Sequence, residues 1–188
     1  MNGRQDDPFF EGLQDSDDAE LAAALVMALA PIAPPPALRA RILDATREGR
    51  LHRFADAIAA MIDVTVDKAR ELLDRIADPS VWQRDLFPGL DAVWVAGGPA
   101  VAGCIRGFAR LGAGQTFPEH EHRGVERQLV LQGAMIDSSG NVARPGDETR
   151  MEAGTRHAYR AADGVDLLLF VVIEHGVDVG EVQLRHQD

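Results

Sequence analysis

In the first half of the chain, apolar residues recur at helical spacing. Leu21, Leu25 and Leu29 lie four residues apart and follow Asp17 and Glu20, which are spaced as in a capping box. Four prolines then fall between positions 31 and 36, where they remove backbone donors. We therefore predict a helix over 17–30, followed by a stiff extended linker over 31–36.

The same period continues after the linker and predicts three more helices. They cover 36–47, with Gly49 as a stop, 51–62, and a last helix that Thr65 caps and Pro79 ends. Their inner faces are Leu38, Ile42 and Ala45; Phe54, Ile58 and Met61; and Val66, Ala69, Leu72 or Leu73, and Ile76. The turn over 63–65 resembles a helix-turn-helix, but the second helix mixes acidic with basic residues. We interpret the pair as a helical hairpin that packs on the following domain.

From Leu90 onward the period changes to two, which is typical of strands. Strands are predicted over 92–95, 102–111, 128–131, 148–152, 157–160 and 165–173, with Gly- and Pro-containing turns between them. Many short strands with regular turns indicate a sandwich or barrel. The run 165–173 is apolar on both faces, so we expect a central strand covered by the helices or by a second subunit.

Composition and charge narrow the functional classes. The formal net charge of −11 argues against a sequence-independent hold on nucleic acid, which needs clustered Lys and Arg. No apolar run approaches the roughly 20 residues of a membrane span. The first twenty residues hold seven acids and one Arg, unlike a signal peptide, so a cytoplasmic protein is expected. The single cysteine, Cys104, excludes an internal disulfide and is interpreted as a buried inert thiol rather than a redox sensor.

A run with metal-ligand spacing lies in the strand-rich half. It reads Gly114, five residues, His120, one residue, His122, three residues, Glu126, six residues and Gly133. Two residues apart on a strand, the histidines share a face, and a turn through Gly124 brings Glu126 back beside them. His157, after Gly154, is the fourth candidate ligand.

Three imidazoles and one carboxylate suit zinc, iron, manganese, nickel or copper better than calcium or magnesium. The alternative is that the histidines are solvated loop residues and that the glutamate is an ordinary surface carboxylate. The flanking glycines and the downstream His157 favour the metal site.

Neighbours of these residues are assigned by strand parity. Gln128 has the parity to face the site and Arg127 does not. Tyr159 shares a face with the fourth ligand and is either a proton donor or a lining aromatic. The sequence does not decide whether the side chains of Arg106 and Phe108 face the interior or the exterior. Residues interpreted as packing at the helix-to-strand junction are Trp82, Phe87 and Trp94.

The metal run resembles, position by position, the first motif of the cupin superfamily, which implies a double-stranded β-barrel or jelly roll. Gly146, Gly154 and His157 fall at the spacing of the second cupin motif. Glu152 stands where proline is usual, and Ala161 where asparagine is usual. These are turn and packing positions, so the four-ligand assignment is kept.

The stretch 30–43 resembles the linker and helix that follow the sigma-binding domain of many anti-sigma factors. With a cupin after it, the chain is similar to the ChrR type, which implies an anti-sigma factor with a zinc cupin that responds to singlet oxygen or related stress. One departure is clear. The family's N-terminal zinc motif, a His followed by Cys-x-x-Cys, has no match, because no histidine precedes His52 and the only cysteine is Cys104.

The sequence therefore predicts an α+β protein with an acidic arm (1–15), a helical region (16–82) and a metal-binding cupin barrel (83–188). The expected function is that of a ChrR-like anti-sigma factor or stress sensor, with a metal-dependent cupin enzyme such as a dioxygenase, or a storage cupin, as alternatives. We expect one divalent transition ion per chain, zinc first, with His120, His122, Glu126 and His157 as its ligands. The expected partners are a sigma factor or other protein, a small molecule in the barrel and a second copy in a homodimer, with neither nucleic acid nor membrane.

Overall fold

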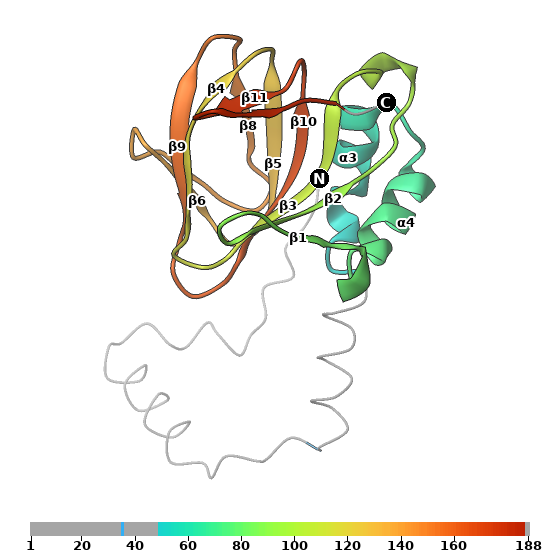
Figure 1. Cartoon of the computed structure of the whole chain (residues 1–188). Helices are drawn as coiled ribbons and strands as arrows, with labels where there is room; N and C mark the ends of the chain where they lie inside the picture. The colour runs from blue at the N-terminus through green and yellow to red at the C-terminus, as the bar shows by residue number, and fades with distance from the viewer. Residues whose placement is uncertain (1–34, 36–48, 187–188) are drawn as a thin grey trace, which may run out of the picture. The chain divides into compact units, whose positions relative to one another are not determined.

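The structure, a computed structural model, describes residue 35 and residues 49–186 (Figure 1). The chain divides into two compact units, 1–44 and 45–188, and every element below belongs to the second. The predicted arm over 1–15, the helices over 17–30 and 36–47 and, apart from Pro35, the linker lie outside the described residues. The predicted boundary between 82 and 83 stays a prediction.

A helical hairpin opens the described part of the second unit. Thr65 caps its second helix, because the Thr65 hydroxyl accepts a hydrogen bond from the backbone N–H of Lys68 at 3.2 Å. Asp63 ends the first helix in the left-handed region, with φ of 56°. Both predicted helices are confirmed. The helices are η1 (His52–Phe54), α3 (Ala55–Ile62), α4 (Val66–Arg75), η2 (Pro79–Val81) and η3 (Pro99–Val101). None of the helices among the described residues is long and apolar enough to cross a membrane.

The strands form two antiparallel six-stranded sheets (Figure 1). The first sheet has the order β1 (Gln83–Phe87), β2 (Leu90–Trp94), β3 (Ile105–Leu111), β10 (Leu167–Ile173), β5 (Glu126–Gln132) and β8 (Glu148–Met151). The second sheet has the order β12 (Val182–Leu184), β11 (Val177–Val179), β4 (Thr116–His122), β9 (Arg156–Ala161), β6 (Met135–Asp137) and β7 (Val142–Ala143).

The predicted closed barrel is corrected by this topology. Strands β1, β8, β12 and β7 end the two sheets and pair on one side only, so the hydrogen-bonded ladder does not close. The strands form a sandwich of two sheets with a core between them. The coarser prediction, helices followed by antiparallel β-structure, is confirmed for the described residues.

Strand β10 lies between β3 and β5 and is buried along its whole length. Its alternating side chains enter two separate cores. Phe170 joins a cluster with Phe108, Leu129 and the buried faces of α3 and α4, whereas Leu169 faces the space between the sheets. Of the two predicted covers for this strand, the structure shows the helices.

The junction between helices and strands is only partly as predicted. Trp82 is 7% exposed, and its indole N–H donates to the carbonyl of Ile76 at 2.9 Å. Phe87 packs edge-on against Phe117. The assignment of Trp94 to the core is wrong, because it is 42% exposed. It helps to line a cavity of about 560 Å³ together with residues of β1, β3 and β12.

Candidate metal centre

Strand β4 carries two of the candidate ligands toward the interior. His120 and His122 are 3% and 0% exposed, as expected for residues two apart on one face. Phe117 lies opposite Tyr159 and His120 lies opposite His157, so β4 has one residue more than β9 between these pairs. This β-bulge lets both Phe117 and His120 face inward although they are three residues apart.

The connection from β4 to β5 returns Glu126 beside the histidines. Glu126 is the first residue of β5 and is 3% exposed. Gly124 lies in this connection, where a Cβ atom would stand 2.4 Å from the backbone oxygen of Glu174. The predicted turn through Gly124 is confirmed, and the close approach of two backbone segments explains the need for glycine.

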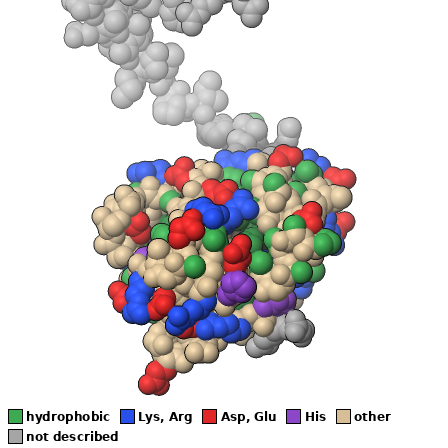
Figure 2. All heavy atoms as spheres, turned by 90° about the horizontal axis from the view of Figure 1, so that it is seen from above, with side chains coloured by type: hydrophobic (Ala, Val, Ile, Leu, Met, Phe, Trp, Pro, Cys, Tyr) green, Lys and Arg blue, Asp and Glu red, His purple; other side chains and the backbone are tan. Residues whose placement is uncertain are grey.

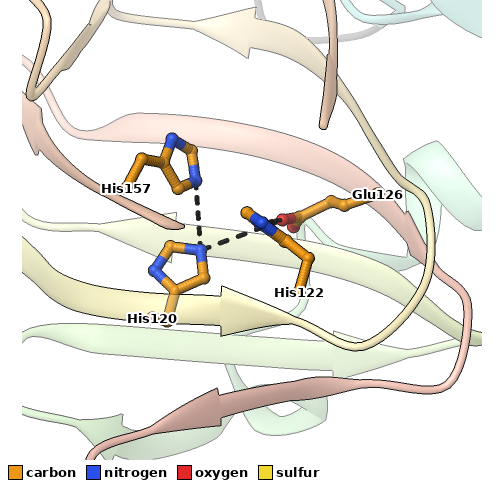
Figure 3. Close-up of side chains that lie close together, drawn as sticks. All are labelled: His120, His122, Glu126 and His157. Carbon is orange, nitrogen blue, oxygen red and sulfur yellow. Dashed lines mark hydrogen bonds and ion pairs between the residues drawn. The ribbon is translucent and has the colours of Figure 1, made fainter. Parts of the chain in front are cut away.

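His157 reaches the same point from β9. It lies opposite His120 in the antiparallel pair, and the Nε2 atoms of the two rings are 3.1 Å apart. Figure 3 shows the four side chains turned toward one another from three strands. One ligand atom from each of His120, His122, Glu126 and His157 lies within 4.8 Å of the others. The structure thus brings together all four candidate ligands that the sequence indicates.

Backbone carbonyls determine which nitrogen of two rings carries the proton. The Nδ1 atom of His120 lies 3.0 Å from the carbonyl oxygen of Pro118, and Nδ1 of His122 lies 3.0 Å from the carbonyl oxygen of Thr155. A carbonyl only accepts, so Nδ1 donates in both rings. In the neutral imidazoles, Nε2 then presents a lone pair to the centre of the cluster, which is the tautomer that metal-binding histidines use.

Two atoms that face each other at the centre of the cluster lack a hydrogen-bond partner. Nε2 of His122 is 2.5 Å from Oε2 of Glu126, and both atoms are buried without a hydrogen-bond partner of suitable geometry. Nδ1 of His157 is likewise buried and unpartnered. Buried lone pairs this close repel unless a cation or a proton lies between them. The donor set and these orphaned atoms fit a divalent transition ion.

The pKa values of the cluster describe the proton that competes with such an ion. Burial opposes ionisation of Glu126, but the neighbouring His120 and His122 imidazoles outweigh it and lower its pKa to about 2. Burial also opposes protonation of His122, yet the Glu126 carboxylate raises its pKa above the ordinary value. Burial and the charge of His120 lower the pKa of His157 to about 4. Of these three side chains, His122 is therefore the one that keeps a proton to the highest pH.

This arrangement predicts a pH dependence of metal binding. Below its raised pKa, His122 holds a proton that the metal must displace, whereas Glu126 and His157 are already deprotonated near neutral pH. Affinity should therefore fall about tenfold per pH unit below the pKa of His122, with release of about one proton per ion bound. Calorimetry of zinc binding in buffers of different ionisation enthalpy measures that number. Release of no proton just below neutral pH would contradict this assignment.

Two residues outside the ligand set hold the ligands in place and were not singled out from the sequence. Pro118 supplies the carbonyl that His120 contacts, and Thr155 supplies a carbonyl and a hydroxyl oxygen, each 3.0 Å from His122 Nδ1. A proline inside a strand is itself a signal of a bulge, so Pro118 could have been noticed. Thr155 gives no such local signal.

The side chains around the site point in the directions that strand alternation predicts. Gln128 is 1% exposed and donates from Nε2 to Oε1 of Glu126 at 2.9 Å. Arg127 points the other way and donates to Glu148 at 2.7 Å. Tyr159 is buried, with its ring centroid 5.3 Å from that of Phe117 and 5.8 Å from that of His157. Its ring therefore lines the interior.

Cys104 and Arg106 lie away from this cluster. Both line the cavity that holds Trp94, and the Arg106 guanidinium donates to the carbonyls of Val101 and Cys104. Burial raises the pKa of the Cys104 thiol, which agrees with its interpretation as an inert thiol.

The outer side of the sheet that contains β4 and β9 is charged. Glu121, between the two histidines of β4, forms ion pairs with Arg123 and Arg156, and Arg123 also pairs with Asp178. On the face drawn in Figure 2, basic and acidic side chains are interleaved. Such pairing leaves fewer free cations for an anionic partner.

Comparison with known proteins identifies one segment of the chain. Residues 101–176, which hold all four clustered side chains, match the model of the ChrR Cupin-like domain. This segment is a ChrR-type cupin domain. The resemblance seen in the sequence is confirmed, and the cupin match spans β3 to β10 with both metal-ligand motifs. No curated protein sequence matches the chain significantly.

One solved structure shares the fold, and two others align less well. The SigE complex with the anti-sigma ChrR from Rhodobacter sphaeroides aligns with a TM-score of 0.52 and 22% identity, over 82% of this chain and 75% of that chain. An RmlC-like cupin from Ralstonia eutropha JMP134 aligns with a TM-score of 0.48 and 19% identity, over 57% and 76%. An acetylacetone dioxygenase from Acinetobacter johnsonii aligns with a TM-score of 0.49 and 12% identity, over 57% of this chain and 81% of that chain.

Proposed function

We propose that this protein is a metal-binding regulator that acts as an anti-sigma factor through protein contacts. The observation that carries the proposal is the buried cluster of three imidazoles and one carboxylate within a ChrR-type cupin domain. Four such donors, all at most 5% exposed, match the ligand number and enclosure of a closed zinc site. Zinc is the proposed ion because it accepts four nitrogen and oxygen ligands without a further open position.

The proposed partner is a sigma factor, and the proposed contact is the apolar stripe Leu21, Leu25 and Leu29. These residues lie outside the described part of the structure, so the stripe rests on sequence spacing alone. Because this region has no Cys-x-x-Cys pair and no histidine before His52, its contact with the partner would not depend on a second zinc ion. The binding segment would instead be a metal-free helix.

The test uses purified full-length protein and each sigma factor of the organism that carries its gene. Wild type should inhibit transcription by RNA polymerase from a promoter of one of these sigma factors. Leu25→Asp places a charge in the stripe and should abolish inhibition, because burying an unpaired carboxylate costs several kcal/mol. Metal content should not change, since the cupin domain holds the metal.

Val165→Asp is the matched control. Val165 is 56% exposed and lies between β9 and β10, so the same change there should leave inhibition intact. If wild type inhibits none of these sigma factors, the regulatory proposal fails. If Leu25→Asp inhibits as well as wild type, only the assignment of the stripe fails.

A metal-dependent enzyme is the second candidate, and Tyr159 is the residue that favours it. Its buried phenol ring lies beside His157, and burial raises its pKa, so it stays a proton donor. Metal-dependent catalysis also needs an open coordination position for substrate. The four clustered donors already satisfy a closed site, which makes the regulator the better fit. The homodimer, a small-molecule ligand in the cupin and the absence of nucleic-acid binding stay predictions.

A further inference from the structure

Gln128 is a fully buried amide in a strand whose other inward positions are a candidate ligand and an apolar side chain. It lies on β5 between Glu126 and Val130 on the inner face, and is 1% exposed. Burying an amide is unfavourable unless its hydrogen bonds are satisfied. Leucine or valine would fill the position without that cost, so the amide has to be explained by what it contacts.

Both ends of the Gln128 amide have a partner. The Nε2 group donates to Oε1 of Glu126 at 2.9 Å, and the Oε1 atom accepts from the hydroxyl of Thr149 at 3.3 Å. Thr149 lies directly opposite Gln128 on β8. Because an ionised carboxylate only accepts, the amino group must be the end that faces Glu126. The Thr149 hydroxyl, which can donate or accept, is compatible with that orientation.

The two carboxylate oxygens of Glu126 therefore have different surroundings. Oε1 is occupied by the Gln128 amide, whereas Oε2 lies 2.5 Å from Nε2 of His122 and 3.8 Å from Nε2 of His120. Oε2 is also the oxygen that lacks a hydrogen-bond partner. Oε2 is thus the oxygen that faces the histidines, and Oε1 is the oxygen that Gln128 holds.

We propose that Gln128 is a positioning residue that makes Glu126 a one-oxygen ligand and so limits the site to four protein donors. The inference rests on the proposed metal site. Three imidazoles and one carboxylate oxygen give the coordination number that zinc accepts readily and that six-coordinate ions do not. Without the Gln128 hydrogen bond, both carboxylate oxygens could turn toward the ion and raise the coordination number.

The experiment compares full-length wild type with Gln128→Met, which keeps the unbranched shape and loses the donor. Zinc affinity, measured by competition with a chromophoric chelator, should fall about 10- to 100-fold. The visible spectrum of the cobalt-loaded protein should weaken, because absorption by Co²⁺ falls as its coordination number rises. Arg127→Met is the matched control, since Arg127 is on the same strand but pairs with Glu148 on the opposite face. It should change neither readout.

The outcomes separate this inference from the metal site itself. If wild type binds neither zinc nor cobalt, the metal site and this role of Gln128 fall together. If wild type binds both and Gln128→Met matches it in affinity and spectrum, only the role of Gln128 falls. Weaker binding with an unchanged cobalt spectrum would also overturn it, because a merely structural residue gives that result. If the variant fails to fold, a crystal structure of the zinc-loaded wild type still tests the proposal. Both Glu126 oxygens at bonding distance from the zinc ion would refute it.

Discussion

Replacing His122 by alanine is expected to lower metal affinity by more than about 100-fold, so that the protein purifies nearly free of metal. Loss of an outer partner already costs about 10- to 100-fold, and His122 is one of only four clustered donors. The change also leaves Glu126 buried without the partner 2.5 Å away. Stability should therefore fall by the lost binding energy, about 4 kcal/mol at a thousandfold excess of metal over its dissociation constant, and further through the uncompensated carboxylate.

Elemental analysis and thermal unfolding, with and without chelator, measure these two effects. His175→Asn is the control, because His175 is exposed and outside the cluster, and asparagine tolerates its φ of 57°. It should bind about one ion per chain and lose stability to chelator as wild type does. Equal metal content in wild type and the His122 variant would mean that the cluster is only a structural relic of a metal site.

Phe108→Ala is expected to lower the free energy of unfolding by about 3–5 kcal/mol, the usual cost of removing a fully buried aromatic side chain. Phe108 is 0% exposed and packs edge-on against Phe170, with ring centroids 4.9 Å apart, in the core shared by the first sheet and the helices. Its loss leaves a cavity where the helical layer meets the sheet. Chemical denaturation of the metal-free protein measures the change without a contribution from the ion.

Trp94→Ala is the control for this second variant, because it also removes an aromatic side chain from the first sheet. Trp94 is 42% exposed, so its truncation should cost less than about 1 kcal/mol. The folded fraction of Phe108→Ala should still bind metal, because Phe108 faces the helices and not the cluster. A cost below that of Trp94→Ala would mean that the helices do not seal this face of the sheet.

The candidate site was largely predictable from the sequence because it depends on local rules. Side-chain alternation places His120 and His122 on one face, a glycine permits the return to Glu126, and the residues on either side of the turn need no distant information. His157 could be named as a fourth candidate from the sequence, but its approach to the other three could not be predicted, since nothing local indicates that β9 pairs with β4.

Other features were missed because they arise from tertiary pairing. Strands β6, β7, β11 and β12 are two or three residues long, too short to show a period. The bulge in β4 breaks the alternation between Phe117 and His120, so a strict period of two fails there. Trp94 was placed in the core because an aromatic residue at a strand position suggests burial. Its exposure depends on tertiary packing, which the sequence does not state.

The two faces of strand β5 contact different parts of the protein. Glu126 and Gln128 project toward the candidate metal centre, while Leu129 and Leu131 project into the core formed with α3 and α4. Close-packed interiors transmit strain, so a change of ligation that moves β5 must also be accommodated where the helices rest on it. A displacement of β5 at the candidate metal centre would thus reach α3 and α4 directly, because only this one strand separates the two sides.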